Sequence, residues 1–273
     1  MAAKVYHSIQ ELRDKARSRI PRIALDYLEG GAGNEANVAR NLTAFQDVIL
    51  VPEYLRDVSR INHGVELFGK YYSAPIGIAP VGLSNLIWPN LDIALAQMAR
   101  EVNIPYVLSA AGTSSIETMA KIAGDNLWFQ LYVSNRDEIS FDLIRRSKEA
   151  GLSELVITVD IPVPAKRFRD IRNGFTLPFQ MTPKTILDIA IHPRWALGTL
   201  KAGTPRFENM VEYMEDAEKG QSLAAAMAMQ NSSKLDTEYM KRLRDAWPEN
   251  LIINSVTSEK GAKVSIENGQ VVY

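Results

Sequence analysis

The chain has 273 residues, of which 46% are hydrophobic and 23% charged, and its formal net charge is −1. The balanced charge and the absence of a long basic run argue against nucleic-acid binding. The lack of cysteine excludes disulfides, thiolate nucleophiles and zinc–thiolate sites, and it suits a reducing compartment such as the cytoplasm. His7, His63 and His192 lack metal-ligand spacing, so we predict no metal site.

The first 70 residues predict an N-terminal helical and capping segment. Residues 8–18 have an amphipathic pattern, and Ser8 and Glu11 have the spacing of a capping box. A second helix is predicted over 22–29, where the glycine-rich stretch "EGGAGNE" ends it. A polar, mixed stretch without a predicted element follows to about Lys70.

From residue 74 onward, predicted strands and helices alternate. Short apolar runs predict strands over 74–80, 105–110, 127–133, 154–160 and 250–255, and "VVY" at 271–273 begins another. Helical spacing predicts helices over 90–103, from Ser115, over 136–151, near 236–247 and near 258–268. A long irregular loop is predicted over 161–233, after the fourth strand. This alternation predicts a parallel sheet whose strands are covered on both faces.

Two α/β architectures fit this alternation, an open doubly wound sheet and an eight-stranded barrel. No strand is followed by a G-x-G-x-x-G turn, and polar residues lie at the C-terminal ends of the strands. We therefore predict an incomplete TIM (β/α)8-type barrel with five strands and the start of a sixth. The predicted organisation is a single domain over 1–273, with 1–70 as the capping segment and 71–273 as the partial barrel.

Polar side chains at the strand ends are the candidate binding residues. Gln130 and Tyr132 in "WFQLYV" leave the same face of their strand, although the strand is otherwise apolar. Ser109 ends the preceding strand, while Thr158 and Asp160 end the following one. A flat heteroaromatic ligand with several donors and acceptors would satisfy such buried groups. The alternatives are hydrogen bonds to local backbone and, for Asp160, an Asx turn that caps the next loop.

Five ordered motifs resemble one enzyme family over nearly the whole chain. They are "DYLEGGAGNE…RNLTAF", "APIGIAPVGL", "LSAAGTSSIE", "WFQLYV" and "TVDIPVPAKRFRDIRNGF". In this order they resemble the FMN-dependent 2-hydroxy acid dehydrogenases and oxidases, which include glycolate oxidase and the L-lactate and mandelate dehydrogenases. The resemblance implies a barrel that binds FMN at its C-terminal mouth and oxidises an L-2-hydroxy acid, with L-lactate as the leading substrate, to the 2-keto acid. It also implies a homo-oligomer.

The resemblance assigns cofactor contacts to six residues. Gln130 would hydrogen-bond the polar edge of the isoalloxazine ring, and Ser109 and Thr158 would bond the ring or its side chain. The turn beside the ring would be formed by Pro80, Val81 and Gly82.

The substrate side is assigned to four residues. Tyr132 would direct its hydroxyl at the substrate, and Asp160 would orient a catalytic histidine. Tyr27 would bind the substrate carboxylate, with Arg167 as a second substrate-side group. The alternatives are that Tyr27 packs as an ordinary helix residue and that Arg167 belongs to a solvated basic loop.

The sequence departs from the family pattern in two places. Asn254 and Ser255 stand where the family has lysine and glycine after the fifth strand, so the cation near the flavin is replaced by a neutral amide. The chain stops at "GQVVY", before the family's "SNHGG"-like turn, the arginine that follows it and the phosphate-binding loop. We therefore expect a C-terminally truncated member.

Two alternatives to a competent enzyme remain open. The first is a non-catalytic flavin-binding or assembly module, and the second, which is weaker, is a different phosphate-binding barrel. The apolar and basic stretch 192–203 leaves peripheral contact with the inner membrane as a less favoured location.

Overall fold

The computed structural model describes residues 5–161, 165–175, 181–213, 234–267, 269 and 271–272. It divides into two compact units. The first comprises Met1–Val48, Ser84–Leu91 and Ala165–Pro205, and the second comprises Ile49–Leu83, Asp92–Pro164 and Arg206–Tyr273. The single-domain organisation stays a prediction.

The first unit is helical. Its helices are α1 (Ile9–Arg17), α2 (Arg22–Glu29), α3 (Ala36–Ala44), α4 (Ser84–Ile87), α8 (Phe168–Arg172), α9 (Pro183–Ala190) and α10 (Pro193–Ala202), with the 3-10 turn η1 (Phe45–Asp47) after α3. The predicted N-terminal cap is confirmed, because the Ser8 hydroxyl accepts the Glu11 N–H at 3.1 Å and the Glu11 carboxylate accepts the His7 N–H at 3.1 Å. The predicted helix over 22–29 is confirmed as α2.

The prediction of irregular chain over 161–233 is wrong for α8, α9 and α10. Both α9 and α10 have proline in the first turn, where a missing N–H costs nothing. Thr182 also caps α9 by accepting the Thr185 N–H at 3.2 Å. Residues 162–164, 176–180 and 214–233 of the predicted loop lie outside the described residues.

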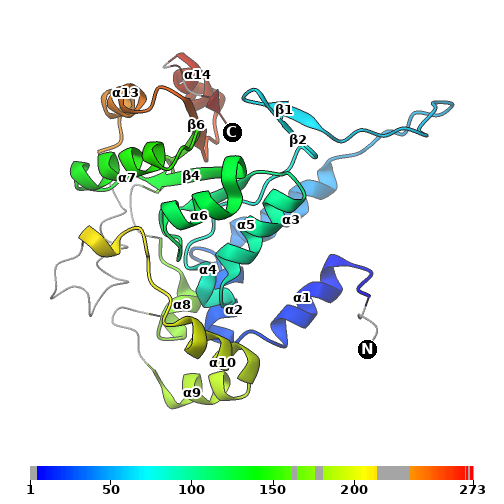
Figure 1. Cartoon of the computed structure of the whole chain (residues 1–273). Coiled ribbons are helices and arrows are strands. Elements are labelled where there is room, and N and C mark those ends of the chain that lie inside the picture. Colours follow the sequence, from blue (N-terminus) through cyan, green and yellow to red (C-terminus); the bar gives the residue numbers. More distant parts are fainter. Residues whose placement is uncertain are drawn as a thin grey trace. The chain divides into compact units, whose positions relative to one another are not determined.

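A five-stranded parallel sheet organises the second unit. Its order is β3 (Tyr106–Ser109), β4 (Leu127–Tyr132), β5 (Glu154–Thr158), β6 (Asn250–Asn254) and β7 (Val271–Val272). The helices α5 (Leu91–Glu101, all but Leu91 in this unit), α6 (Ile116–Ala123), α7 (Asp137–Glu149), α13 (Thr237–Ala246) and α14 (Glu259–Glu267) fall where the sequence predicts helices (Figure 1). This is the α/β pattern of a TIM-type barrel, and within the described residues the sheet is open.

The predicted strand over 74–80 is reduced to a single bridge between Ile78 and Tyr106. Ile78 donates its N–H to the Pro105 carbonyl at 2.8 Å and accepts the Val107 N–H at 3.0 Å. Pro75 and Pro80 flank it and cannot donate to a ladder, so the pairing does not extend.

A short hairpin covers one face of the sheet. It consists of β1 (Val65–Leu67) and β2 (Lys70–Tyr72), in a stretch for which no element was predicted. Tyr72 packs in one buried cluster with Trp128, Val156 and Ile252, and its hydroxyl accepts the Trp128 indole N–H at 3.2 Å. The hairpin therefore covers the part of this face near Trp128, Val156 and Ile252. The C-terminal ends of the strands stay uncovered and are available for a binding site.

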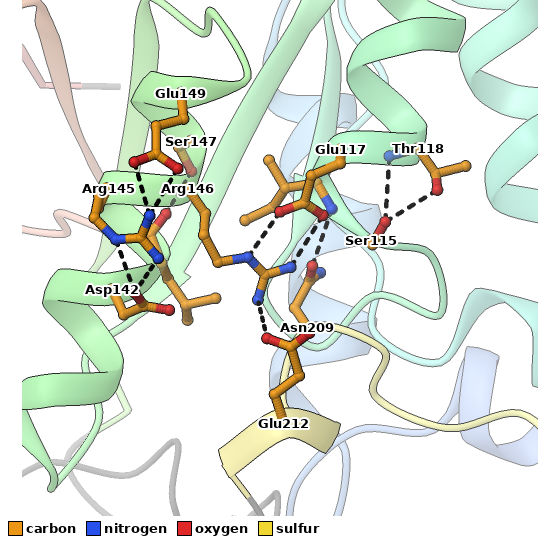
Figure 2. A network of polar contacts seen from close by, with 12 residues as sticks. Ser115, Glu117, Thr118, Asp142, Arg145, Arg146, Ser147, Glu149, Asn209 and Glu212 are labelled. Atoms are coloured by element: carbon orange, nitrogen blue, oxygen red, sulfur yellow. Dashed lines mark hydrogen bonds and ion pairs between the residues drawn. The ribbon is translucent and has the colours of Figure 1, made fainter.

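A polar network holds the segment 206–213 against α6 and α7 (Figure 2). The Arg146 guanidinium contacts the Glu117 carboxylate at 2.8 and 3.0 Å. Asn209, which has no exposed surface, accepts the Ile116 N–H at 3.0 Å and donates to the Ser114 carbonyl at 3.1 Å. The N-terminus of α6 is thereby capped by a residue about ninety positions later in the chain.

Candidate functional site

A pocket of about 380 Å³ lies in the second unit, on the face of the sheet that the hairpin partly covers. Its volume falls within the usual range for small-molecule sites. It is lined by Leu67, Pro75, Ile76, Gly77, Ile78, Ala79, Pro80, Pro105, Val107, Trp128, Tyr132, Val156, Thr158, Asp160, Ile161, Ile252, Asn254 and Ser255. The lower wall is apolar, and the polar groups lie at the C-terminal ends of β4, β5 and β6.

Strand register explains why these side chains meet. Tyr132 pairs with Thr158 and Thr158 pairs with Asn254, so the last residues of three neighbouring strands stand side by side. Because side chains alternate along a strand, Gln130 on β4 leaves the same face two residues earlier. The predicted convergence of polar groups is therefore present for Tyr132 and Thr158, with Asn254 as a further member.

A chain of hydrogen bonds crosses this face. The Ser109 hydroxyl accepts the Ala111 N–H at 3.1 Å and donates to the Gln130 carbonyl oxygen at 2.9 Å. The Gln130 amide then donates to the Thr158 hydroxyl at 3.0 Å, and the Asn254 amide donates to the same oxygen at 3.4 Å. Since Thr158 accepts two N–H groups, its own hydrogen is available to an acceptor in the pocket.

Ser109 and Gln130 are on the face of the sheet that forms the pocket, but they do not line the pocket itself. Ser109 is 2% exposed and Gln130 is 0% exposed, and neither is among the lining residues. Their predicted direct contact with a ligand remains a prediction. In the described structure they act through Thr158, whose hydroxyl they orient.

Tyr132 and Asp160 form the polar rim. Burial, followed by the nearby Asp160 carboxylate, raises the pKa of the Tyr132 phenol, so the hydroxyl stays protonated at neutral pH and can donate a hydrogen bond. Asp160 is exposed at the mouth and lines the pocket, where its carboxylate can meet a positive charge.

The turn after Ile78 contributes one lining residue of the three that were predicted. Pro80 lines the pocket, whereas Val81 and Gly82 are half-buried and are not among the lining residues. The predicted contacts of Val81 and Gly82 with a ligand remain predictions.

Tyr27 and Arg167 belong to the first unit, where the structure brings them together. The Arg167 guanidinium lies 4.9 Å from the centre of the Tyr27 ring and donates to the Tyr27 carbonyl oxygen. Arg167 also pairs with Asp170 at 2.8 Å, and Phe175 packs 5.3 Å from Tyr27 between ring centres. Arg167 is thus a half-buried, structured residue and not part of a solvated loop.

The apolar wall of the pocket was not predicted from the sequence. It includes Val107, Val156 and Ile252, which lie on the same strand faces as the polar groups, and Leu67 from the hairpin. The signal was available, because Val156 lies two residues before Thr158 and Ile252 two residues before Asn254.

Comparison with known proteins gives a consistent picture. A family model described as FMN-dependent dehydrogenase matches residues 16–272. The (S)-mandelate dehydrogenase of Pseudomonas putida is 37% identical over 262 residues, covering 96% of this chain and 66% of the relative. A putative L-lactate dehydrogenase of Mycobacterium tuberculosis is 32% identical over 263 residues, covering 96% of this chain and 62% of the relative. The chain therefore spans about two thirds of the length of these curated relatives.

The solved structures agree with the sequence matches. A crystal structure of the monotopic membrane protein (S)-mandelate dehydrogenase matches with a TM-score of 0.91 and 35% identity, covering 98% of this chain and 71% of that chain. A mandelate oxidase variant with (S)-mandelic acid matches with a TM-score of 0.76 and 26% identity, covering 98% of this chain and 67% of that chain.

Proposed function

The chain belongs to the FMN-dependent dehydrogenase family, and from this premise we propose that it holds the FMN ring in the pocket of the second unit and forms the substrate side of an L-2-hydroxy acid oxidation. The observation that carries the proposal is the polar rim of Tyr132, Thr158, Asp160 and Asn254 above an apolar wall. This arrangement suits a flat ring with one polar edge and one apolar edge.

The residues present fit the ring of FMN. Thr158 offers a hydroxyl hydrogen and Asn254 an amide, while the ring offers oxygen and nitrogen acceptors along one edge. Val107, Val156 and Ile252 provide apolar surface for the ring face. No arginine or lysine is among the described residues that line this pocket, so the phosphate would be held by residues outside it.

The residues of this chain would bind and orient the substrate. FMN, when bound, supplies the acceptor for the hydride equivalent. Tyr132 would donate its phenolic hydrogen to a substrate oxygen, and Asp160 would stabilise a developing positive charge beside it. Tyr27 and Arg167 would bind the substrate carboxylate, which a guanidinium can hold with two parallel hydrogen bonds.

The proton acceptor would lie outside this pocket. Among the described lining residues there is no histidine, and Asp160 is the single carboxylate. Because no histidine is among these lining residues, a second candidate function is that the chain by itself binds flavin without turnover and acts as an assembly module.

FMN binding tests the cofactor assignment. We expect the fluorescence of FMN to be quenched when it binds to the chain. Thr158→Val should weaken FMN binding about tenfold, which is equivalent to the loss of one hydrogen bond of about 1.4 kcal/mol. Thr43→Val on α3, where the hydroxyl bonds only to helix carbonyls, is the matched control. Equal affinity in the two variants, or no binding by the parent chain, would contradict the assignment.

Anaerobic reduction separates the two candidates. Loss of flavin absorbance after addition of (S)-mandelate or L-lactate supports the enzyme, and retained FMN without bleaching supports the module.

As the substrate, we propose an aryl-substituted 2-hydroxy acid ahead of L-lactate, because sequence identity is 37% to the mandelate dehydrogenase and 32% to the putative lactate dehydrogenase.

We also propose that α9 and α10 touch a lipid surface. The two helices contact each other in the first unit (Figure 1). Their exposed apolar side chains are Ile186, Leu187, Ile191, Leu197 and Leu200. The exposed cations Lys184, Arg194 and Lys201 flank these side chains. Trp195 anchors α10 by donating its indole N–H to the Leu86 carbonyl at 3.0 Å. Such an amphipathic surface suits the headgroup region of an anionic bilayer.

No helix among the described residues has the length and apolarity needed to cross a membrane. We propose a peripheral attachment through α9 and α10, and sedimentation with phosphatidylglycerol vesicles measures it. We expect Leu197→Asp with Leu200→Asp to abolish binding, while Leu42→Asp on α3 leaves it unchanged. Vesicle binding that is equal in all three proteins would contradict this surface.

A further inference from the structure

A buried carboxylate lies beside the Arg167 guanidinium where α8 meets α2 in the first unit (Figure 1). Asp170, in the first turn of α8, is 7% exposed, and its Oδ2 lies 2.8 Å from Arg167 Nε. Burial raises the pKa of the Asp170 carboxyl, and the charge of Arg167 opposes that rise. Arg167 is therefore the partner that favours the ionised form of this carboxyl.

Three contacts hold the Arg167 guanidinium. Its Nε faces Asp170, its Nη2 donates to the Tyr27 carbonyl oxygen, and its centre lies 4.9 Å from the centre of the Tyr27 ring. Its Nη1 makes no hydrogen bond or ion pair with a described residue. Since the Arg167 side chain is 31% exposed, the donors on Nη1 remain available to an anion.

The neighbouring Arg169 does not take Asp170 as its partner. Arg169 pairs with Glu35 and with Asp26, whose Oδ1 lies 3.5 Å from Arg169 Nη1. Because Arg169 engages both of these carboxylates, Asp170 is the carboxylate of the cluster that remains for Arg167. The two guanidiniums thus have separate acidic partners, which keeps each in its own place.

We propose that Asp170 is a positioning residue, which fixes Arg167 against Tyr27 so that the Nη1 donors are presented to a substrate carboxylate. This inference rests on the proposed function of Tyr27 and Arg167 as the carboxylate-binding pair. A free arginine side chain has large rotamer entropy, and an arginine that is fixed before the ligand arrives does not lose that entropy on binding. Asp170 itself does not touch the ligand.

A purely structural role for Asp170 makes a different prediction. A negative charge in the first turn favours a helix, so Asp170 would then stabilise α8 without any effect on ligand binding. Simple electrostatics also predicts the opposite sign, because removal of a negative charge next to an anion site strengthens the binding of an anion. Weaker anion binding after removal of the charge is therefore specific to positioning.

Side-chain mobility tests the positioning directly, in the chain without FMN. The measurement is the heteronuclear nuclear Overhauser effect at Nε of Arg167, which reports motion of the guanidinium. We expect a rigid value in the parent chain and a decrease in Asp170→Asn to the value of the exposed Arg194 on α10. An unchanged value in the variant would overturn the inference.

Carboxylate binding tests the consequence, in the presence of FMN. The probe is phenylacetate, an aryl carboxylate without a 2-hydroxyl group to oxidise, and phenylacetamide is its neutral counterpart. Asp170→Asn should weaken phenylacetate binding about tenfold and change phenylacetamide binding little. Unchanged or tighter phenylacetate binding would overturn the inference. Absence of phenylacetate binding in the parent would instead contradict the proposed function, and the mobility of Arg167 would still decide whether Asp170 positions it.

Glu29→Gln on α2 is the matched control. It also removes a carboxylate charge from the first unit, but Glu29 pairs with Arg13 at 2.8 Å and with Arg17 at 2.9 Å. We expect it to change neither the mobility of Arg167 nor the affinity for phenylacetate.

A double variant keeps the test decisive if Asp170→Asn alone fails to fold. Arg167→Ala with Asp170→Asn leaves neither charge of the pair without its partner, so it is less prone to unfold than Asp170→Asn. If Asp170 acts through Arg167, the double variant binds phenylacetate as weakly as Arg167→Ala does. A further loss of affinity in the double variant would overturn the inference, because Asp170 would then act on the ligand by another route.

Discussion

At the residue scale, Gln130 shows how a buried amide is satisfied. Its carbonyl oxygen accepts from Ser109 and its amide donates to Thr158, at 2.9 and 3.0 Å. A buried amide left unpaired would be costly, so the sequence correctly predicts that Gln130 has partners. It does not predict that these partners are neighbouring strands, because a ligand could satisfy the same groups.

Replacement of Gln130 by methionine removes both bonds while keeping the volume. Ser109 and Thr158 then lose a buried partner, and we expect a loss of about 1–3 kcal/mol in unfolding free energy. Urea denaturation measures it, with Gln97→Met on the exposed face of α5 as the control. If both variants lose the same amount, the buried chain does not contribute to stability.

Ser255 is a strained residue at the pocket. Its φ of 73° is in the left-handed region, where a side chain is unfavourable. Ser255→Gly should therefore stabilise the fold by about 0.5–1 kcal/mol, after the higher entropy of unfolded glycine is subtracted.

The reverse change serves as its control. Gly151 has a φ of 82°, and a Cβ added there meets nothing within 4 Å, so Gly151→Ser should destabilise through backbone conformation alone. The melting temperature measures both variants. A lower melting temperature for Ser255→Gly would show that the serine side chain makes a compensating interaction.

At the element scale, α6 depends on contacts from distant parts of the chain. Its N-terminal cap comes locally from Ser115, which accepts the Thr118 N–H at 3.2 Å, and remotely from Asn209. Its exposed face is tied to α7 through Glu117 and Arg146 (Figure 2). The helix start at Ser115 was evident from the sequence, whereas Asn209 was not, since no local pattern links it to α6.

The Glu117–Arg146 pair predicts a pH dependence. The hydrogen bond from Arg146 lowers the pKa of Glu117 to about 2, below its value in the unfolded chain. The stabilisation is therefore complete above about pH 5 and disappears as the pH falls towards 2. Because Glu117 is 45% exposed, solvent screening limits the size of the effect.

Glu117→Gln isolates this effect. The difference in urea midpoint between the parent and the variant should be largest near neutral pH and shrink on acidification. Glu101→Gln on α5 is the control, because its carboxylate makes no ion pair among the described residues. A difference that does not change with pH would mean that Glu117 stabilises through packing.

The elements that were missed from the sequence each have a physical reason. In α3, Glu35 at the N-cap has a φ of 62°, and its helix has no side-chain cap, so start signals are weak. In α9 and α10, several apolar residues are exposed, so their periodic pattern does not mark a face that packs against the core. The β1–β2 hairpin has only three residues in each strand, too few to show alternation.

At the scale of the whole molecule, the exposed segment 49–61 predicts an ordered proteolysis. Arg60 is exposed in a segment without secondary structure, whereas Arg146 on α7 is held by ion pairs. Trypsin should therefore cut after Arg60 before it cuts within α7. Mass spectrometry of early fragments measures the order, and early cleavage after Arg146 would contradict it.

The sequence alone was enough to predict the alternation of strands and helices, the parallel sheet, the capped N-terminal helix and the family, because each is encoded in short-range periodicity or in ordered motifs. The folded structure was needed to see that Ser109, Gln130, Thr158 and Asn254 form one hydrogen-bonded chain, that Arg167 stacks on Tyr27, and that residues 49–61 lie exposed. These features depend on strand register and on contacts between residues far apart in the chain, which local patterns do not encode.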